Sequence, residues 1–258
     1  MAKSVLDLTD SHAHIDDPGF DADREAMFAR AADAGVRQIV VPAVDRESWN
    51  RIAAICASHP QALPAYGLHP IYIARHRPEH LAELATQLKT RRPVAVGEIG
   101  LDFFLTELDQ ERQRHFFVQQ LRLAREFDLP VIVHARRAMD EVTSTMRRIG
   151  GLRGVVHSFA GSLQQAQRLW DLGFCLGIGG PVTYERAQRL RHVVATMPLD
   201  RLLLETDAPD QPGACHRGER NEPANLREVL DVVAQLRGES QASIAAATSE
   251  NARRLFKP

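Results

Sequence analysis

Short apolar runs alternate along the chain with longer segments in which apolar residues recur every three or four positions. The short runs, such as Gln38–Val41 and Val131–Val133, are almost continuously apolar, which is typical of parallel strands buried on both faces. The longer segments, such as Leu108–Phe127, have the periodicity of amphipathic helices. The pattern therefore predicts a β-strand followed by an α-helix, repeated along the chain.

Eight strand–helix units can be assigned in this way. The predicted strands are Val5–Asp10, Gln38–Val41, Leu63–Gly67, Val94–Val96, Val131–Val133, Gly154–Val156, Phe174–Leu176 and Leu202–Leu204. The predicted helices are Asp21–Ala34, Arg46–Ser58, Glu79–Lys89, Leu108–Phe127, Met139–Arg148, Leu163–Leu172, Glu185–Thr196, Leu226–Leu236 and Ala242–Phe256. Eight such units in 258 residues predict an α/β protein, a TIM (β/α)8 barrel formed as a single domain over residues 1–258.

An open, doubly wound sheet would show the same alternation. That alternative loses support because no Gly-x-Gly-x-x-Gly follows the first strand and no phosphate-binding P-loop motif occurs. A polar loop at Ala208–Glu222 is long for a connection in a compact domain, and we expect it to be an ordered functional loop.

Composition narrows the class of protein. The formal net charge is −1, which gives no overall attraction to nucleic acid or to a membrane surface. The three cysteines form no Cys-x-x-Cys pair, which fits a reducing compartment. The N-terminus lacks the apolar region of a signal peptide, and no apolar run reaches the length of a membrane span. We therefore expect a cytoplasmic protein without a membrane partner or an obligate protein partner.

Residue types that bind metals recur where the predicted strands end. In a barrel these carboxyl ends meet at one mouth, where active sites lie. Alternation along an extended chain would turn the first pair, His12 and His14, to the same side. The residues concerned are His12, His14, His69, Glu98, His134, His157 and Asp207. Each alone could be an ordinary loop or capping residue, but so many at one end of a barrel favour a metal site at the C-terminal mouth.

The chemistry of the set predicts hydrolysis. Its ligands exceed the needs of one four-coordinate structural metal, and no cysteine belongs to it. Glu98 could bridge two cations that clamp the attacking and leaving oxygens of an in-line displacement. A water held there would become a metal-bound hydroxide near neutral pH, with Asp207 as its general base. Zn, Mn, Fe, Ni or Co would suit the imidazoles, whereas Mg prefers oxygen ligands.

Several motifs resemble those of one family. They are Ser11–Asp16, Gly67–Pro70, Gly97–Asp102, Pro130–Arg136, His157–Gly161, Glu205–Pro209, Asn221–Pro223 and Thr248–Phe256. Over nearly its full length the chain resembles the TatD family of metal-dependent deoxyribonucleases, in the amidohydrolase superfamily. The resemblance implies two divalent metal ions and cleavage of phosphodiester bonds, with Glu98 and Asp207 catalytic. It gives the metal-ligand role to His12, His14, Glu98, His134, His157 and Asp207.

The expected substrate is DNA, at 3′ ends or as single strands. Phosphates need cationic or hydrogen-bonding contacts, and the candidates near the mouth are His69, Arg136, Arg217 and Arg220. The role of His69 follows mainly from the resemblance. Many family members have an aromatic residue where this chain has Asp210, so a ring that could stack on a base is missing there.

Two other functions are compatible with the same residues. The same metal site could hydrolyse an ester or amide, such as an aminoacyl ester or a cyclic amide. The barrel could also be a metal-binding or nucleic-acid-binding protein without catalytic activity, although the complete ligand set argues against this.

Overall fold

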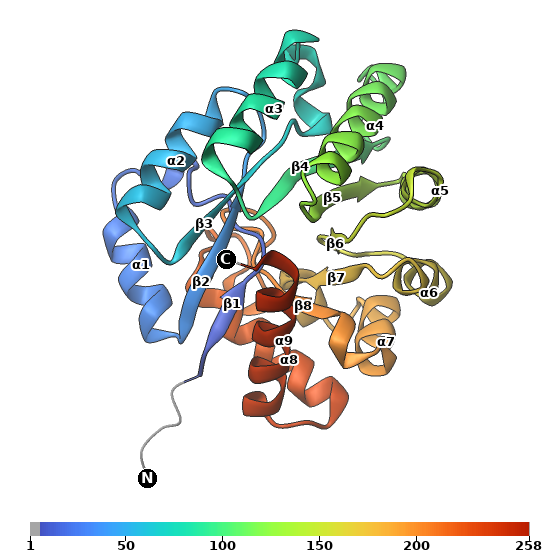
Figure 1. Ribbon diagram of the computed structural model, residues 1–258. Helices are drawn as coiled ribbons and strands as arrows, with labels where there is room; N and C mark the ends of the chain where they lie inside the picture. The colour runs from blue at the N-terminus through green and yellow to red at the C-terminus, as the bar shows by residue number, and fades with distance from the viewer. Residues whose placement is uncertain (1–5, 258) are drawn as a thin grey trace.

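The computed structural model describes residues 6–257, which form a ring of eight parallel strands surrounded by helices (Figure 1). The strands are β1 (Leu8–Asp10), β2 (Val36–Pro42), β3 (Ala62–Tyr66), β4 (Ala95–Asp102), β5 (Val131–Arg136), β6 (Gly154–Val156), β7 (Cys175–Ile178) and β8 (Leu202–Leu204). Each strand pairs with the next in the sequence, and the amide of Ser11 donates to the carbonyl of Leu204 at 2.9 Å, which joins the two ends of the sheet. The predicted TIM barrel is confirmed.

The helices follow the strands in the predicted order. They are α1 (Arg24–Asp33), α2 (Ser48–Ser58), α3 (Glu79–Arg91), α4 (Gln110–Glu126), α5 (Met139–Ile149), α6 (Leu163–Asp171), α7 (Gln188–Thr196), α8 (Leu226–Arg237) and α9 (Gln241–Phe256). Short 3-10 turns occupy Pro18–Phe20, Pro70–Arg75, Gly180–Thr183, Leu199–Arg201, Ala214–His216 and Pro223–Asn225. The described residues include no helix that combines the length and the apolar character needed to cross a membrane.

The fourth strand is longer than predicted. The sequence pattern places its end at Val96, but β4 continues to Asp102 because its residues from Ile99 onward pair with β5 after a shift in register. Gly97 and Gly100 therefore lie within the strand. The predicted start of the first strand, Val5, lies outside the described residues.

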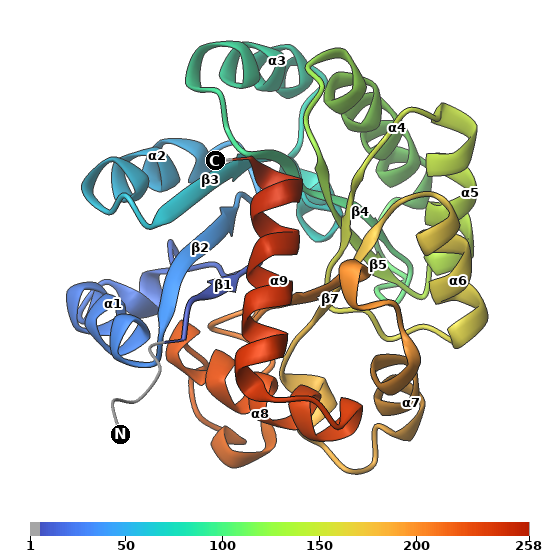
Figure 2. The same cartoon turned by 60° about the horizontal axis from the view of Figure 1, so that its bottom comes forward.

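Alternation along the strands builds two separate cores. In β5, Val131 and Val133 face outward and join the core between the sheet and the helices, whereas Ile132 faces inward. The inner core is closed from below by α9, whose Leu255 and Phe256 pack against the strand residues inside the barrel. Helix α9 stands against the barrel in Figure 2. Helix α9 thus closes the N-terminal end of the barrel, and the polar residues at the carboxyl ends of the strands lie at the opposite mouth.

Candidate metal centre

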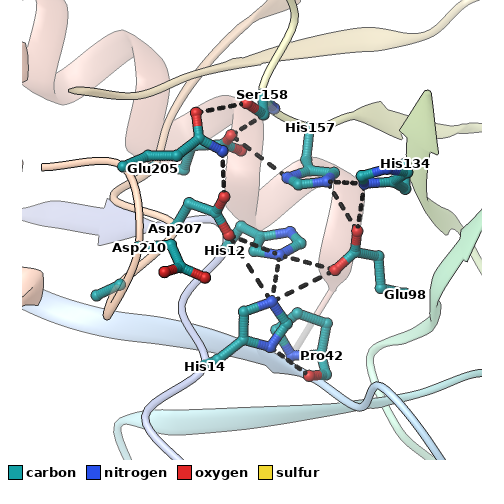
Figure 3. A network of polar contacts seen from close by, with 12 residues as sticks. His12, His14, Pro42, Glu98, His134, His157, Ser158, Glu205, Asp207 and Asp210 are labelled. Carbon is teal, nitrogen blue, oxygen red and sulfur yellow. Dashed lines mark hydrogen bonds and ion pairs between the residues drawn. The ribbon is translucent and has the colours of Figure 1, made fainter. Parts of the chain in front are cut away.

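Glu98 lies at the centre of the polar cluster in the barrel mouth, and its side chain is only 1% exposed (Figure 3). Its Oε2 atom is 3.1 Å from Nε2 of His12 and 3.4 Å from Nε2 of His14. The Oδ1 atom of Asp207 lies 3.5 Å and 3.7 Å from the same two nitrogens. Both imidazoles of the His-x-His pair therefore face Asp207 across the mouth, as the strand ends predict.

The other carboxylate oxygen of Glu98 faces a second group of imidazoles. Its Oε1 atom is 2.8 Å from Nε2 of His69, 2.8 Å from Nε2 of His157 and 3.1 Å from Nδ1 of His134. The two oxygens of one carboxylate thus divide the histidines into two groups. This is the arrangement expected of a carboxylate that bridges two cations.

The backbone at the end of β1 explains why His12 and His14 point the same way. The amide of Ala13, between them, donates to the carbonyl of Val40 at 3.0 Å, so the chain stays extended beside β2. The amide of Asp207 donates to the carbonyl of His12 at 2.9 Å. Asp207 adopts a left-handed conformation, with φ of 57°, which suits a tight turn immediately after β8.

Two of the histidines are oriented by partners outside the cluster. The Nδ1 atom of His14 lies 3.1 Å from the carbonyl oxygen of Pro42, and Nε2 of His134 lies 2.9 Å from Oδ2 of Asp102. A neutral imidazole that donates from one nitrogen presents a lone pair at the other. Each ring therefore directs its free nitrogen toward Glu98, as metal-binding histidines commonly do.

His69 differs from the other histidines of the cluster. Its Nδ1 atom accepts a hydrogen bond from the amide of Ile71 at 3.1 Å, so the neutral ring carries its proton on Nε2, toward Glu98. Burial, the largest effect, lowers the pKa of His69 to about 4, which keeps the ring neutral. His69 is therefore placed as a hydrogen-bond donor, which separates it from the rings that offer a lone pair.

The donor atoms fit a metal site better than a hydrogen-bonded cluster. Glu98 Oε1 is buried within 3.1 Å of three imidazole nitrogens, yet none of these contacts has hydrogen-bond geometry. Ligands about 2.0–2.1 Å from a tetrahedral cation lie roughly 3.3 Å from one another. Three groups are close enough to hold a cation; they are His12–His14–Glu98, His69–Glu98–His134 and His12–His157–Glu205.

The charge of Glu98 favours protonation of two neighbouring imidazoles, those of His14 and His157, in the metal-free cluster. Burial lowers the pKa of His14, but the hydrogen bond and charge of Glu98 outweigh it and raise that pKa to about 9. Burial likewise opposes a charge on His157, yet Glu98 holds its pKa well above the usual value. Burial raises the pKa of Asp207 to about 6. Glu98 therefore favours positive charge on some of its neighbours, whereas burial keeps His12 and His69 neutral.

Two buried glutamines of α4 fix the loops that carry site residues. The carboxamide of Gln113 accepts from the amide of Asp102 at 2.8 Å and donates to its carbonyl at 3.1 Å. Gln120 makes the same pair of bonds with Leu68, at 2.8 Å and 3.1 Å, and thereby holds the residue before His69. Neither glutamine can be recognised from the sequence, because the helical pattern alone does not distinguish them from surface residues.

A cavity of about 1520 Å³ opens above the cluster. His69 and Arg136, two of the predicted substrate-binding residues, line it. Arg217 and Arg220 do not, and the Arg220 guanidinium is engaged with the Asp23 carboxylate at 2.8 Å and 2.7 Å. The structure therefore brings together the six predicted metal ligands and two of the four predicted substrate contacts.

Comparison with known proteins agrees with this geometry. The model of the TatD related DNase family matches residues 9–257. The chain is 45% identical over 256 residues to the uncharacterized metal-dependent hydrolase YjjV of Escherichia coli K12, covering 98% of each protein. It is 37% identical to the 3′-5′ ssDNA/RNA exonuclease TatD of Cronobacter sakazakii, over 96% of this chain and 97% of that protein.

Solved structures agree as well. The crystal structure of YjjV, a TatD homologue from E. coli K12, superposes with a TM-score of 0.95 at 42% identity, over 98% of this chain and 99% of that chain. The Glu98-centred cluster in the barrel mouth and these full-length matches lead to one conclusion. The chain belongs to the TatD-related DNase family of metal-dependent hydrolases.

Proposed function

We propose that this protein is a phosphodiesterase with two divalent metal ions that removes nucleotides from the 3′ ends of single-stranded DNA. The observation that carries the proposal is the division of the imidazoles between the two oxygens of Glu98. A carboxylate surrounded in this way suits a pair of cations about 3.5–4 Å apart, the arrangement used for in-line displacement at phosphorus.

Each cation would have its own ligands. His12, His14 and Asp207 would hold one, His134 and His157 would hold the other, and Glu98 would contribute one oxygen to each. The imidazole-rich set favours Zn, Mn, Fe, Ni or Co over Mg. When bound, the cations would polarise the phosphodiester and lower the pKa of an attacking water.

Asp207 is the residue that we assign as general base. Its Oδ1 atom faces the histidines, while Oδ2 accepts a hydrogen bond from the side chain of Gln211. One oxygen is thus positioned by the protein while the other faces the centre of the cluster. Because burial raises its pKa, the carboxylate is a better proton acceptor than an exposed aspartate.

His69 and Arg136 are assigned to the substrate. The Nε2–H group of His69 points into the cluster and could donate to a non-bridging phosphate oxygen. Arg136 lies two residues after His134 on β5, on the same side of the strand. Its guanidinium suits the phosphate next to the phosphodiester that is cleaved.

A nucleic-acid substrate is supported by the cavity and by the relatives. The cavity extends well beyond the metal centre, as a polymeric substrate requires, and five arginines line it. The relative from Cronobacter sakazakii is named a 3′-5′ exonuclease of single-stranded DNA and RNA. Acidic residues such as Asp45 and Glu47 share the rim, so the ester and amide hydrolase alternative belongs in the same test.

The test uses protein stripped with a chelator and reloaded with Zn, Mn or Co. We expect reloaded protein to release mononucleotides from a 3′-labelled single strand, and Asp207→Asn to lower the turnover number about 100-fold or more. A panel of aminoacyl esters and lactones is assayed in parallel. Turnover of an ester without release of nucleotides would overturn the nuclease assignment.

A further inference from the structure

Phe104 is an exposed aromatic residue at the cavity, and the proposed metal chemistry does not use it. Its side chain is 41% exposed, although burial of such a ring would be favourable, and it lines the cavity. The guanidinium carbon of Arg136 lies 3.7 Å from the centre of its ring, and that of Arg137 lies 4.8 Å away. An aromatic ring beside two guanidinium groups is a combination typical of sites that bind single-stranded nucleic acid.

The two arginines at this ring are free to bind an anion. Of the arginines that line the cavity, Arg51 and Arg75 form ion pairs with aspartates, and Arg189 donates to a backbone carbonyl. Within residues 6–257, the side chains of Arg136 and Arg137 make neither an ion pair nor a hydrogen bond. Their charges are therefore available to phosphate groups.

The ring is fixed at a defined place relative to the metal centre. Oδ1 of Asp102 accepts hydrogen bonds from the amides of Phe104, at 2.9 Å, and Leu105, at 3.2 Å, while its Oδ2 faces His134. Arg136 stands opposite Asp102 in the pairing of β4 with β5, two residues beyond His134. Two residues of a strand span about 6.6 Å, roughly the length of one nucleotide.

We propose that Phe104 is a stacking platform for the base next to the scissile phosphodiester, and that Arg136 and Arg137 bind the phosphate of that nucleotide. This inference rests on the proposed nuclease activity and names the part of the substrate that the cavity recognises. The platform accepts any base, because stacking uses the face of the ring system and not its hydrogen-bonding edge. It supplies on the β4 side the aromatic contact that Asp210 does not provide.

The test compares two single strands that differ by one base. One is an oligothymidylate, and the other carries an abasic tetrahydrofuran residue next to the bond that is cut. Metal-loaded wild-type protein should cleave the complete strand with a kcat/KM at least about tenfold higher than the abasic strand. Phe104→Ala should remove this difference, whereas Phe104→Trp should retain the preference.

Leu163→Ala is the matched control. Leu163 is equally exposed, at 40%, but lies outside the cavity, so its replacement should leave both rates unchanged. If wild-type protein cleaves both strands equally, or Phe104→Ala keeps the wild-type preference, the stacking platform is wrong while the nuclease assignment stands. If wild-type protein cleaves neither strand, the proposed function itself fails.

A binding measurement detects stacking without turnover. The strand carries 2-aminopurine, whose fluorescence is quenched by stacking, and it is titrated with metal-loaded Asp207→Asn protein. We expect the Asp207→Asn protein to quench the fluorescence. The double variant with Phe104→Ala should not quench it, and the double variant with Phe104→Trp should quench it again. Equal quenching by the variants with and without the Phe104 ring would overturn the inference.

Discussion

The Nε2 atom of His134 lies 2.9 Å from Oδ2 of Asp102, a carboxylate that is fully buried and that also holds the loop beyond β4. This contact fixes the orientation of the ring and leaves Nδ1 facing Glu98. One buried carboxylate therefore connects a proposed metal ligand to the wall of the cavity. Carboxylates in this position strengthen metal binding through the histidine that they orient.

Replacing Asp102 should consequently weaken metal binding. We expect Asp102→Ala to reduce the affinity for one of the two cations about 10- to 100-fold, measured by competition with a chromophoric chelator. The control is Asp109→Ala, which removes the N-cap of α4 but no contact with the metal centre. It should cost about 1 kcal/mol of stability and leave the metal affinity unchanged. Equal affinities in Asp102→Ala and wild-type protein would contradict the role of this contact.

Arg136 and Arg220 should respond differently to removal of their charge. Arg136 has no acidic partner within the described residues, and its replacement by alanine should raise KM for single-stranded DNA about tenfold. The slope of the logarithm of the binding constant against the logarithm of the salt concentration should also fall by about one, because one fewer counterion is released. Arg220→Ala should leave KM unchanged, because that guanidinium forms an ion pair with Asp23. The substitution should lower the free energy of unfolding by about 1 kcal/mol or less. Equal effects of the two substitutions on KM would be inconsistent with this assignment.

Metal binding should release protons near neutral pH. The pKa of His14 in the metal-free protein is raised to about 9, and that of His157 lies well above its usual value, so both rings hold protons at pH 7.5. A metal ion needs the neutral rings and must displace these protons. The apparent affinity should therefore rise as the pH increases from 6 to 9. Calorimetry in buffers of different ionisation enthalpy measures the release, and an affinity that falls with pH would contradict the expected sign.

The two carboxamide contacts of α4 should contribute to stability and to activity. Gln120→Leu keeps the volume of the side chain but leaves the amide and carbonyl of Leu68 without partners. We expect a loss of about 1–3 kcal/mol in the free energy of unfolding and a lower kcat, because Leu68 positions His69. Gln119→Leu, one residue away and without such bonds among the described contacts, is the control. Denaturant unfolding of the two variants distinguishes a specific contact from a general effect of substitution.

The barrel, and the gathering of the candidate metal ligands at its mouth, could be predicted because both depend on local sequence. Each strand includes a short apolar run, and each candidate ligand lies in the C-terminal part of its strand or within a few residues after it, so the topology of a parallel barrel alone brings them together. Glu98 lies in the mouth although it stands within β4 and not at the end of the strand, because β4 continues past it along the wall of the cavity.

Contacts between distant segments could not be predicted from the sequence. Asp23 and Arg220 are 197 residues apart, and nothing in either segment indicates that they pair. The same holds for Gln120 and Leu68, or for Phe104 and Arg136, because such contacts depend on the packing of loops and helices around the barrel. The predicted metal ligands therefore came together, whereas only part of the predicted substrate set did.

The central claim is that two cations on either side of Glu98 are needed for cleavage of single-stranded DNA. It is tested most directly by adding Zn or Mn in steps to metal-free protein while 3′-end cleavage is measured. We predict that activity is absent without metal and reaches its plateau at two equivalents per chain. Cleavage that persists in the metal-free protein, or that reaches its plateau at one equivalent, would contradict the claim.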